Sequence, residues 1–146
     1  MRENFEGYHE MSDLLSDWNI DPNGNKEVFI ALKEQVMSKD NILISFKARP
    51  GVSYSLRGSL MGSDRTESRL FVLIDIIDDD PDERWLSVCF YGDSITDDNG
   101  LGDLIPGGLL GEDGYCFDIY EIEESAISYL KGRIDEAYVK TLASFD

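Results

Sequence analysis

Positive charge is almost missing from the second half of this chain. No lysine or arginine occurs between Arg84 and Lys131, a stretch of 46 residues that carries ten carboxylates. From Asp75 onward, 19 acidic residues stand against 4 basic ones, a net charge of −15, whereas residues 1–74 carry 11 against 9. One region of the folded surface must therefore project a strongly negative field. Such a field repels DNA, RNA and anionic lipid, so we expect neither a nucleic-acid nor a membrane partner.

Cysteine and histidine are also scarce. The two cysteines, Cys89 and Cys116, lie 27 positions apart in apolar surroundings, without the close pairs typical of zinc sites or the dense framework of secreted domains. We therefore expect both to be reduced thiols in the core. The only histidine, His9, falls in a predicted helix, so a nucleophilic His–Cys dyad is disfavoured. The sequence favours a protein that is not an enzyme.

Long apolar runs are absent from the sequence. No run of about 18 apolar residues occurs, and residues 1–10 lack the apolar core of a signal peptide. The sequence thus predicts a cytoplasmic protein. Its length of 146 residues, with 42% hydrophobic and 11% aromatic residues, suits one folded body, so we expect residues 1–146 to form a single globular domain.

Helical periodicity dominates both ends of the chain. Apolar residues recur every three or four positions over residues 5–18, over 25–38 and from 121 to about 143. The turn residues at 21–24 separate the first two helices, and Asn25 is placed to cap the second.

Between these helices the hydrophobic period changes to two. The predicted strands are 42–47, 52–56, 70–77, 84–91 and 115–119. Residues 70–77 are apolar at seven of eight positions, which is typical of a central strand covered on both faces. The sum is an α+β fold with two N-terminal helices, a mainly antiparallel sheet of about five strands, and a long C-terminal helix packed on one sheet face.

Residues 92–114 are the least ordinary segment. They hold seven of the thirteen glycines, and connections of this length in compact domains are usually functional or disordered. The segment also holds five large aliphatic residues: Leu101, Leu104, Ile105, Leu109 and Leu110. These residues either pack onto the domain's own sheet or form an adhesive patch ringed by carboxylates.

Acidic and aliphatic residues together suggest a binding surface for a positively charged protein. Charge steers such a partner, and buried apolar contact keeps it bound. The leading hypothesis is therefore a non-enzymatic, cofactor-free binding module of the inhibitor, adaptor or chaperone type, by analogy of size and charge. The predicted partner-binding residues are Asp78, Asp79, Asp80, Asp82, Glu83, Asp93, Asp97, Asp98, Asp103, Leu109, Leu110, Glu112 and Asp113.

Two alternatives stay open. In the first, the chain is a small enzyme or sensor that holds Ca²⁺ or Mg²⁺ with carboxylates of the glycine-rich segment, near Tyr91 and Tyr115. The candidate metal ligands are Asp93, Asp97, Asp98 and Asp103. In the second, the apolar segment and the strands bury a homodimer face, and the function lies elsewhere.

Asp75 is the one charge within the apolar run 70–77. A lone carboxylate there is costly unless it is paired or lies on the wet face of the sheet, and Arg57 and Lys47 are its candidate partners. By alternation these two bases share a hairpin face with Ser45, Ser53 and Ser55. This basic, serine-lined strip either binds an anionic ligand or forms salt bridges with Asp75.

Overall fold

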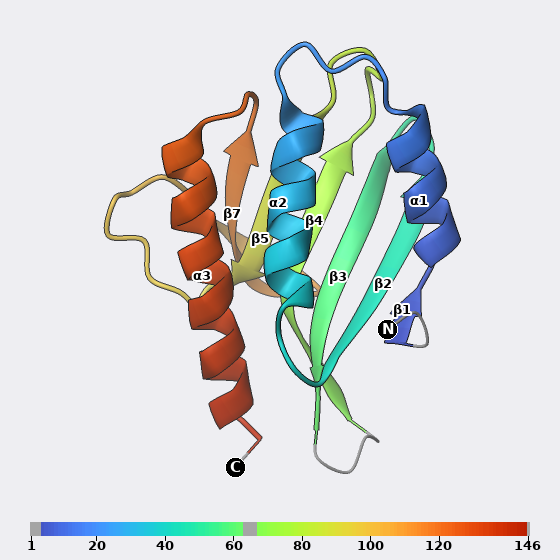
Figure 1. Cartoon of the computed structure of the whole chain (residues 1–146). Helices are drawn as coiled ribbons and strands as arrows, with labels where there is room; N and C mark the ends of the chain where they lie inside the picture. Colours follow the sequence, from blue (N-terminus) through green and yellow to red (C-terminus); the bar gives the residue numbers. More distant parts are fainter. Residues whose placement is uncertain (1–3, 63–66, 146) are drawn as a thin grey trace.

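The computed structural model describes residues 4–62 and 67–145. In chain order the elements are β1 (Phe5–Glu6), α1 (Tyr8–Asp17), α2 (Asn25–Met37), β2 (Ile42–Arg49), β3 (Ser53–Met61), β4 (Ser68–Ile77), β5 (Trp85–Tyr91), β6 (Asp103–Leu109), β7 (Glu112–Ile119) and α3 (Glu124–Ala143) (Figure 1). The α+β class, the two N-terminal helices and the long C-terminal helix are confirmed.

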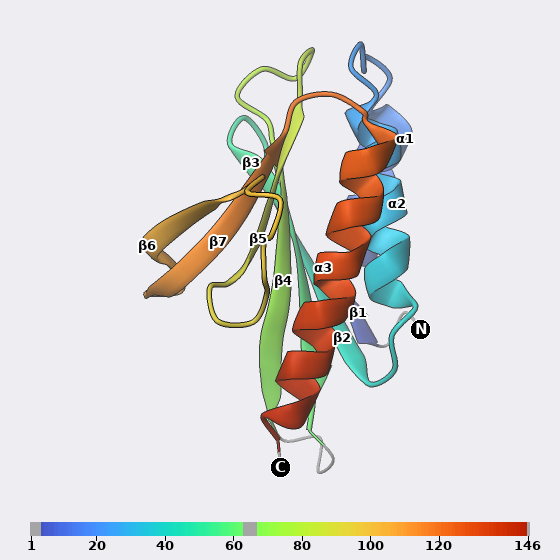
Figure 2. The same ribbon diagram turned by 90° about the vertical axis from the view of Figure 1, so that its left-hand side faces the viewer.

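The strands form one sheet in the order β1-β2-β3-β4-β5-β7-β6. β1 runs parallel to β2, and every other neighbouring pair is antiparallel. β4 is the central strand, as its apolar run predicts. All three helices lie on the same side of the sheet (Figure 2). We call the opposite side the open face. Within the described ranges, no helix has the length and apolar character needed to span a bilayer.

The core lies between the helices and the inward-facing residues of the three middle strands. Leu56, Ile74 and Val88 share this face across β3, β4 and β5, and each is completely buried. Burial of one such side chain is worth about 1.5–3 kcal/mol, so this layer is a main source of stability. Phe29 of α2 and Ile134 of α3 are also completely buried and belong to the same core cluster.

The first helix starts later than its periodicity predicts. Phe5 and Glu6 form β1 beside Ile44 and Ser45, and the helix begins at Tyr8. Gly7 between them has a φ of 83°, and a Cβ at that position would lie 2.1 Å from the Phe46 carbonyl oxygen. Only glycine fits this close approach, so the chain changes direction there.

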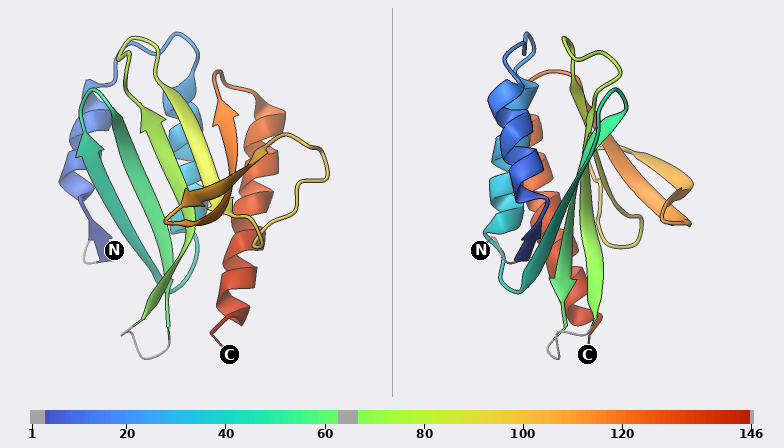
Figure 3. Two further views of the ribbon diagram at one scale, coloured as in Figure 1. Left: turned by 180° about the vertical axis from the view of Figure 1, so that it is seen from behind. Right: turned by 90° about the vertical axis from the view of Figure 1, so that its right-hand side faces the viewer.

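The sheet has seven strands where about five were expected, because β1 and β6 were not anticipated. Pro106, Gly107 and Gly108 lie inside β6, and such residues ordinarily mark a loop. β7 also begins at Glu112, before the predicted 115. The long connection therefore shrinks to residues 92–102, and the rest forms a β6–β7 hairpin. This hairpin stands out from the open face of the sheet (Figures 2 and 3).

Asn25 acts differently from the expected helix cap. The carboxylate of Asp21 caps α2 instead, accepting hydrogen bonds from the backbone N–H groups of Asn25 at 2.9 Å and Lys26 at 3.0 Å. The Asn25 side chain is completely buried and donates to the carbonyl oxygens of Arg84 at 2.9 Å and Tyr120 at 3.0 Å. It thereby ties the start of α2 to the start of β5 and the end of β7.

We expect Asn25→Ala to lower the free energy of unfolding by about 2 kcal/mol, because two carbonyl groups lose a donor. Urea denaturation followed by circular dichroism measures the change. Asn19→Ala is the matched control, since Asn19 is exposed and its side chain makes no hydrogen bond to another described residue. A loss in Asn25→Ala no larger than in this control would show that the link is unimportant.

Candidate functional site

The projecting hairpin and the connection before it expose large aliphatic side chains. Leu101, Leu104, Ile105 and Leu110 are 41–60% exposed, whereas Leu109 is buried. β6 is the outermost strand of the sheet, so no described strand pairs with its outer edge. Exposed aliphatic residues gathered on one projecting element are typical of a contact surface.

An acidic pocket lies beside this hairpin, where β5 ends and β7 begins. It has a volume of about 390 Å³ and is lined by Tyr91, Gly92, Asp93, Leu104, Glu112 and Asp113. Strand pairing builds it, because Tyr91 lies opposite Gly114 and the Gly92 N–H donates to the Asp113 carbonyl at 2.9 Å. The end of β5 and the start of β7 thus bring Asp93 beside Asp113.

The lining of the acidic pocket contains three carboxylates and no lysine or arginine. Burial raises the pKa of the Tyr91 hydroxyl, and the negative charge of Glu112 raises it further. Glu112 and Asp93 form no ion pair with another described residue. The pocket therefore presents uncompensated negative charge beside an aromatic ring and the side chain of Leu104.

Such a lining suits a lysine or arginine side chain. Carboxylates pair with its charged head, the tyrosine ring offers a cation–π contact, and leucine packs on its methylene stem. A neighbouring hollow of about 490 Å³ shares Tyr91, Asp93 and Glu112 and adds Leu110, with Arg69 and Lys140 also in its lining. Exposed aliphatic residues therefore accompany the carboxylates in both hollows.

Asp97, predicted as a partner or metal ligand, instead holds its own segment in place. Its carboxylate accepts four hydrogen bonds: from the hydroxyls of Tyr129 at 2.6 Å and Tyr115 at 2.7 Å, and from the backbone N–H groups of Gly102 at 2.9 Å and Leu101 at 3.1 Å. Burial opposes its ionisation, but these hydrogen bonds outweigh that effect and lower its pKa to about 2. Asp97 therefore fastens the connection 92–102 to β7 and α3.

A second set of hydrogen bonds joins the connection 92–102 to α3. Both carboxylate oxygens of Glu136 accept hydrogen bonds from Thr96, one from its N–H and one from its hydroxyl, each at 2.9 Å. Arg133 pairs with Glu136 at 3.2 Å and donates to the Thr96 carbonyl. The connection 92–102 is thus anchored at two successive residues, Thr96 and Asp97.

The predicted acidic residues divide between two places. Asp78 is buried, pairs with Arg84 at 2.7 Å and accepts the Gly51 N–H at 2.7 Å, so it holds the β2–β3 and β4–β5 turns together. The exposed remainder of that group lies at the end of the sheet beside the α1–α2 connection, away from the hairpin (Figure 1): Asp79, Asp80, Asp82 and Glu83. Asp98 and Asp103 are exposed near the hairpin but do not line the acidic pocket.

The four predicted cation ligands do not converge. Asp93 lines the acidic pocket, Asp97 is occupied by its own hydrogen bonds, and Asp98 and Asp103 lie outside that pocket. Over residues 4–62 and 67–145, no three His, Cys, Asp or Glu side chains come together as a metal site.

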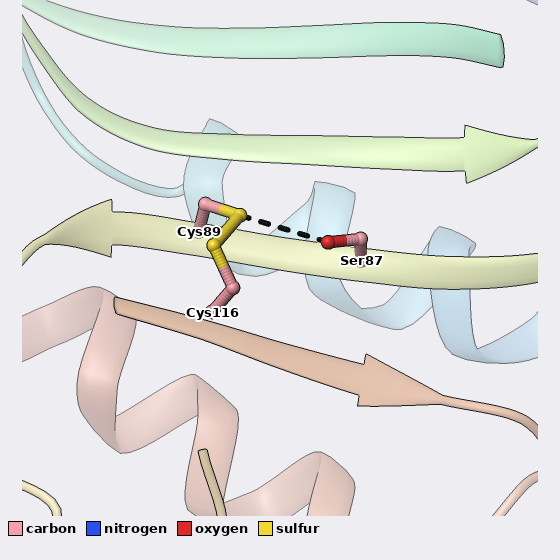
Figure 4. The surroundings of a disulfide bond; sticks show 3 residues. All are labelled: Ser87, Cys89 and Cys116. Atoms are coloured by element: carbon pink, nitrogen blue, oxygen red, sulfur yellow. Dashed lines mark hydrogen bonds between the residues drawn. A yellow bond between two sulfur atoms is a disulfide. The ribbon is translucent and has the colours of Figure 1, made fainter. Parts of the chain in front are cut away.

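The cysteines are joined, and the expectation of reduced thiols is wrong. Cys89 of β5 and Cys116 of β7 lie directly opposite each other, with their Cα atoms 4.2 Å apart, and form a disulfide bond (Figure 4). The Ser87 hydroxyl lies 3.6 Å from the Cys89 sulfur. The bond closes the chain around the connection 92–102 and β6, which carry the exposed side chains of Leu101, Leu104 and Ile105.

Asp75 is hydrogen-bonded to a serine and forms no ion pair with Arg57 or Lys47, although Arg57 acts on it electrostatically, as expected of a nearby partner. Its carboxylate accepts a hydrogen bond from the Ser55 hydroxyl, which lies directly opposite on β3. Burial raises the pKa of Asp75, while Ser55, Arg49 and Arg57 act in the other direction.

Comparison of the chain with protein-family models, with curated proteins and with solved structures gives no match. The candidate site therefore stands on its own geometry.

The sequence predicted that the acidic residues of the pocket bind a partner, but not that they lie close together. The available signal was the pairing of two predicted strands: if 84–91 and 115–119 are antiparallel neighbours, residues just after the first lie beside those just before the second. The same pairing places Cys89 opposite Cys116. The role of Asp97 had no such signal, because its partner Tyr129 lies on α3, 32 residues away.

We expect Asp97→Asn to lower the free energy of unfolding at neutral pH. We also expect this free energy to change less with pH in the acidic range than it does in the wild type. The folded pKa of Asp97 is about 2 against an ordinary 3.8, so its stabilising contribution is complete above about pH 4 and is lost as the pH falls towards 2. Urea denaturation at a series of acidic pH values measures this. Equal pH slopes for the wild type and the variant would contradict the assignment.

We expect reduction of the disulfide to lower the free energy of unfolding by about 3.5 kcal/mol, the amount that loop-closure entropy gives for a sequence separation of 27. Alkylation with mass spectrometry should find no free thiol in the non-reduced protein. Denaturation with and without reductant gives the energy, and the Cys89→Ser/Cys116→Ser variant controls for other effects of the reductant. Two free thiols in the non-reduced protein would refute the pairing.

Proposed function

We propose that this protein is a non-enzymatic binding module that engages a basic protein through the acidic pocket and the exposed aliphatic residues of the β6–β7 hairpin. The observation that carries the proposal is the pocket lining, in which three carboxylates, a tyrosine and a leucine occur together without a base. A lysine or arginine of the partner enters this pocket, and apolar partner residues cover Leu104 and Leu110.

The distribution of charge supports this choice of partner. The chain carries a net charge of −17, with −15 of it from Asp75 onward. Such a field speeds the approach of a positively charged surface, and buried apolar contact then slows its departure. The hairpin combines both features on one projecting element.

The edge of β6 is poorly suited to adding a partner strand. Pro106 has no N–H group to donate, and the pairing of β6 with β7 shifts register between Ile105 and Leu109. Proline and bulges on edge strands discourage strand addition. We therefore place the contact in the side chains of the hairpin, not in its backbone.

The two alternative functions receive less support. Self-association through the hairpin would bring together two surfaces of the same strong negative charge, which the long-range field opposes. A divalent cation would need several converging oxygen ligands, and among residues 4–62 and 67–145 such a group does not form. A basic protein partner requires neither the contact of two negatively charged surfaces nor a group of converging oxygen ligands.

A peptide-display selection on the immobilised protein at low salt tests the proposal. We expect the selected peptides to be enriched in lysine and arginine next to apolar residues. Binding of the best synthetic peptide should weaken by about tenfold when salt rises from about 50 to about 500 mM, because the charge pairs are screened. Selected peptides without basic residues, or with affinity unchanged by salt, would count against the proposal.

A pair of matched double variants locates the contact. Asp93→Asn/Glu112→Gln removes two charges from the acidic pocket, and Asp79→Asn/Glu83→Gln removes the same two kinds of charge from the distant β4–β5 connection. We expect about tenfold weaker peptide binding in the first and less than about twofold change in the second, measured by calorimetry. Equal weakening in both would mean that only overall charge matters and that the pocket is not the site.

A further inference from the structure

A second surface of the molecule has the opposite character. Lys47 and Arg49 of β2 and Arg57 of β3 are exposed and, by strand alternation, share the open face. The register sets each base directly opposite a serine: Lys47 opposite Ser55, Arg49 opposite Ser53, and Arg57 opposite Ser45. None of the three bases therefore has an acidic side chain directly across the β2–β3 pair.

These three bases form no ion pair with a described residue, which is also true of Lys26, Lys131 and Lys140, but they alone lie together on one strip. The protein has 30 acidic residues and 13 basic ones, so most bases have acids to choose from. Lys33, Lys39, Arg69, Arg84 and Arg133 each form an ion pair. In the described part of the chain, Lys47, Arg49 and Arg57 form none. Three cations without an ion pair therefore gather on one strip of a strongly acidic protein, and the nearby Asp75 carboxylate interacts electrostatically with Arg49 and Arg57.

The strip lines a pocket of about 520 Å³, which we call the basic pocket. The three bases line it together with Ser45 and Ser55, while Glu6 and Glu10 contribute from β1 and α1. The Ser55 hydroxyl proton is committed to Asp75, whereas the Ser45 side chain makes no hydrogen bond within the described chain. The pocket thus offers two guanidinium groups, one ammonium group and one free hydroxyl to a ligand.

We propose that the basic pocket binds a small anion whose acid group is a carboxylate or a phosphate, held by Arg49, Arg57 and Lys47. Guanidinium groups match such oxygens in pairs of parallel hydrogen bonds, and lysine adds a point charge. Glu6 and Glu10 restrict the choice, because they repel a ligand of high negative charge. A ligand with one or two negative charges suits the pocket better than a polyphosphate or a nucleic acid.

The basic pocket and the acidic pocket are lined by different residues. The basic pocket lies on β2 and β3 beside β1, whereas β7 and β6 form the other end of the sheet. The two pockets share no lining residue, so variants at Lys47 and at Asp93 with Glu112 test the two proposals separately, although Arg57 acts electrostatically on Tyr91 of the acidic pocket.

Titration of the ¹⁵N-labelled protein with inorganic phosphate and with succinate, at constant ionic strength, tests the inference by NMR. We expect saturable shifts of the amide signals of β2 and β3 with at least one of the two anions. The stronger ligand identifies the preferred acid group. Succinamide, which has the same carbon skeleton without charge, should cause no such shifts. Shifts that do not saturate, or that sodium chloride reproduces at equal ionic strength, would overturn the proposal.

Variants that each remove one positive charge identify which side chains contact the anion. Arg57→Gln and Lys47→Gln should each weaken binding of the preferred anion by about tenfold, since each removes a charged donor. Lys131→Gln is the matched control, because it removes one positive charge from α3 outside the basic pocket, and we expect less than about twofold change. Equal effects of all three variants would show that the anion responds only to net charge. Circular dichroism establishes that each variant is folded.

Discussion

One-sided burial of the sheet is the constraint on which the rest of this structure depends. Leu56, Ile74 and Val88 are completely buried beneath the helices, and they belong to the hydrophobic core of the chain. All three helices pack on that face of the sheet. The other face carries serines, charged side chains and the disulfide. Both candidate sites arise there or at its border, because polar groups and uncovered aliphatic residues can be placed only where no helix covers the sheet.

The acidic pocket depends on a set of local anchors. Asp97 and Glu136 bind the connection 92–102 to β7 and α3, and the Cys89–Cys116 bond closes the chain around it. A glycine-rich segment without such anchors would lose a large conformational entropy on binding a partner. The anchors remove much of that cost in advance, because the exposed aliphatic residues are already presented on an ordered hairpin.

Charge is separated along the sheet as well as along the chain. The acidic pocket at the β7–β6 end is lined by three carboxylates and no base, and the basic pocket at the β2–β3 end is lined by three bases together with Glu6 and Glu10. The two surfaces keep these charges because local pairing was avoided: each base of the strip faces a serine, and Asp75 takes its hydrogen bond from Ser55. Uncompensated charge costs stability through self-repulsion, so its retention at two defined surfaces favours roles in binding.

The sequence by itself determined the fold class, the central strand, the strand pairs β2–β3 and β4–β5, and the excess of negative charge, since these follow from local periodicity and composition. Only the tertiary structure decided which contacts particular acidic residues make. Asp78 became a buried partner of Arg84, Asp97 became an anchor for Tyr115 and Tyr129, and Asp93 met Glu112 at a pocket. An aspartate has the same local pattern in each of these roles. Which role it takes depends on side chains that are distant in sequence, and only the pairing and packing of strands and helices bring those together.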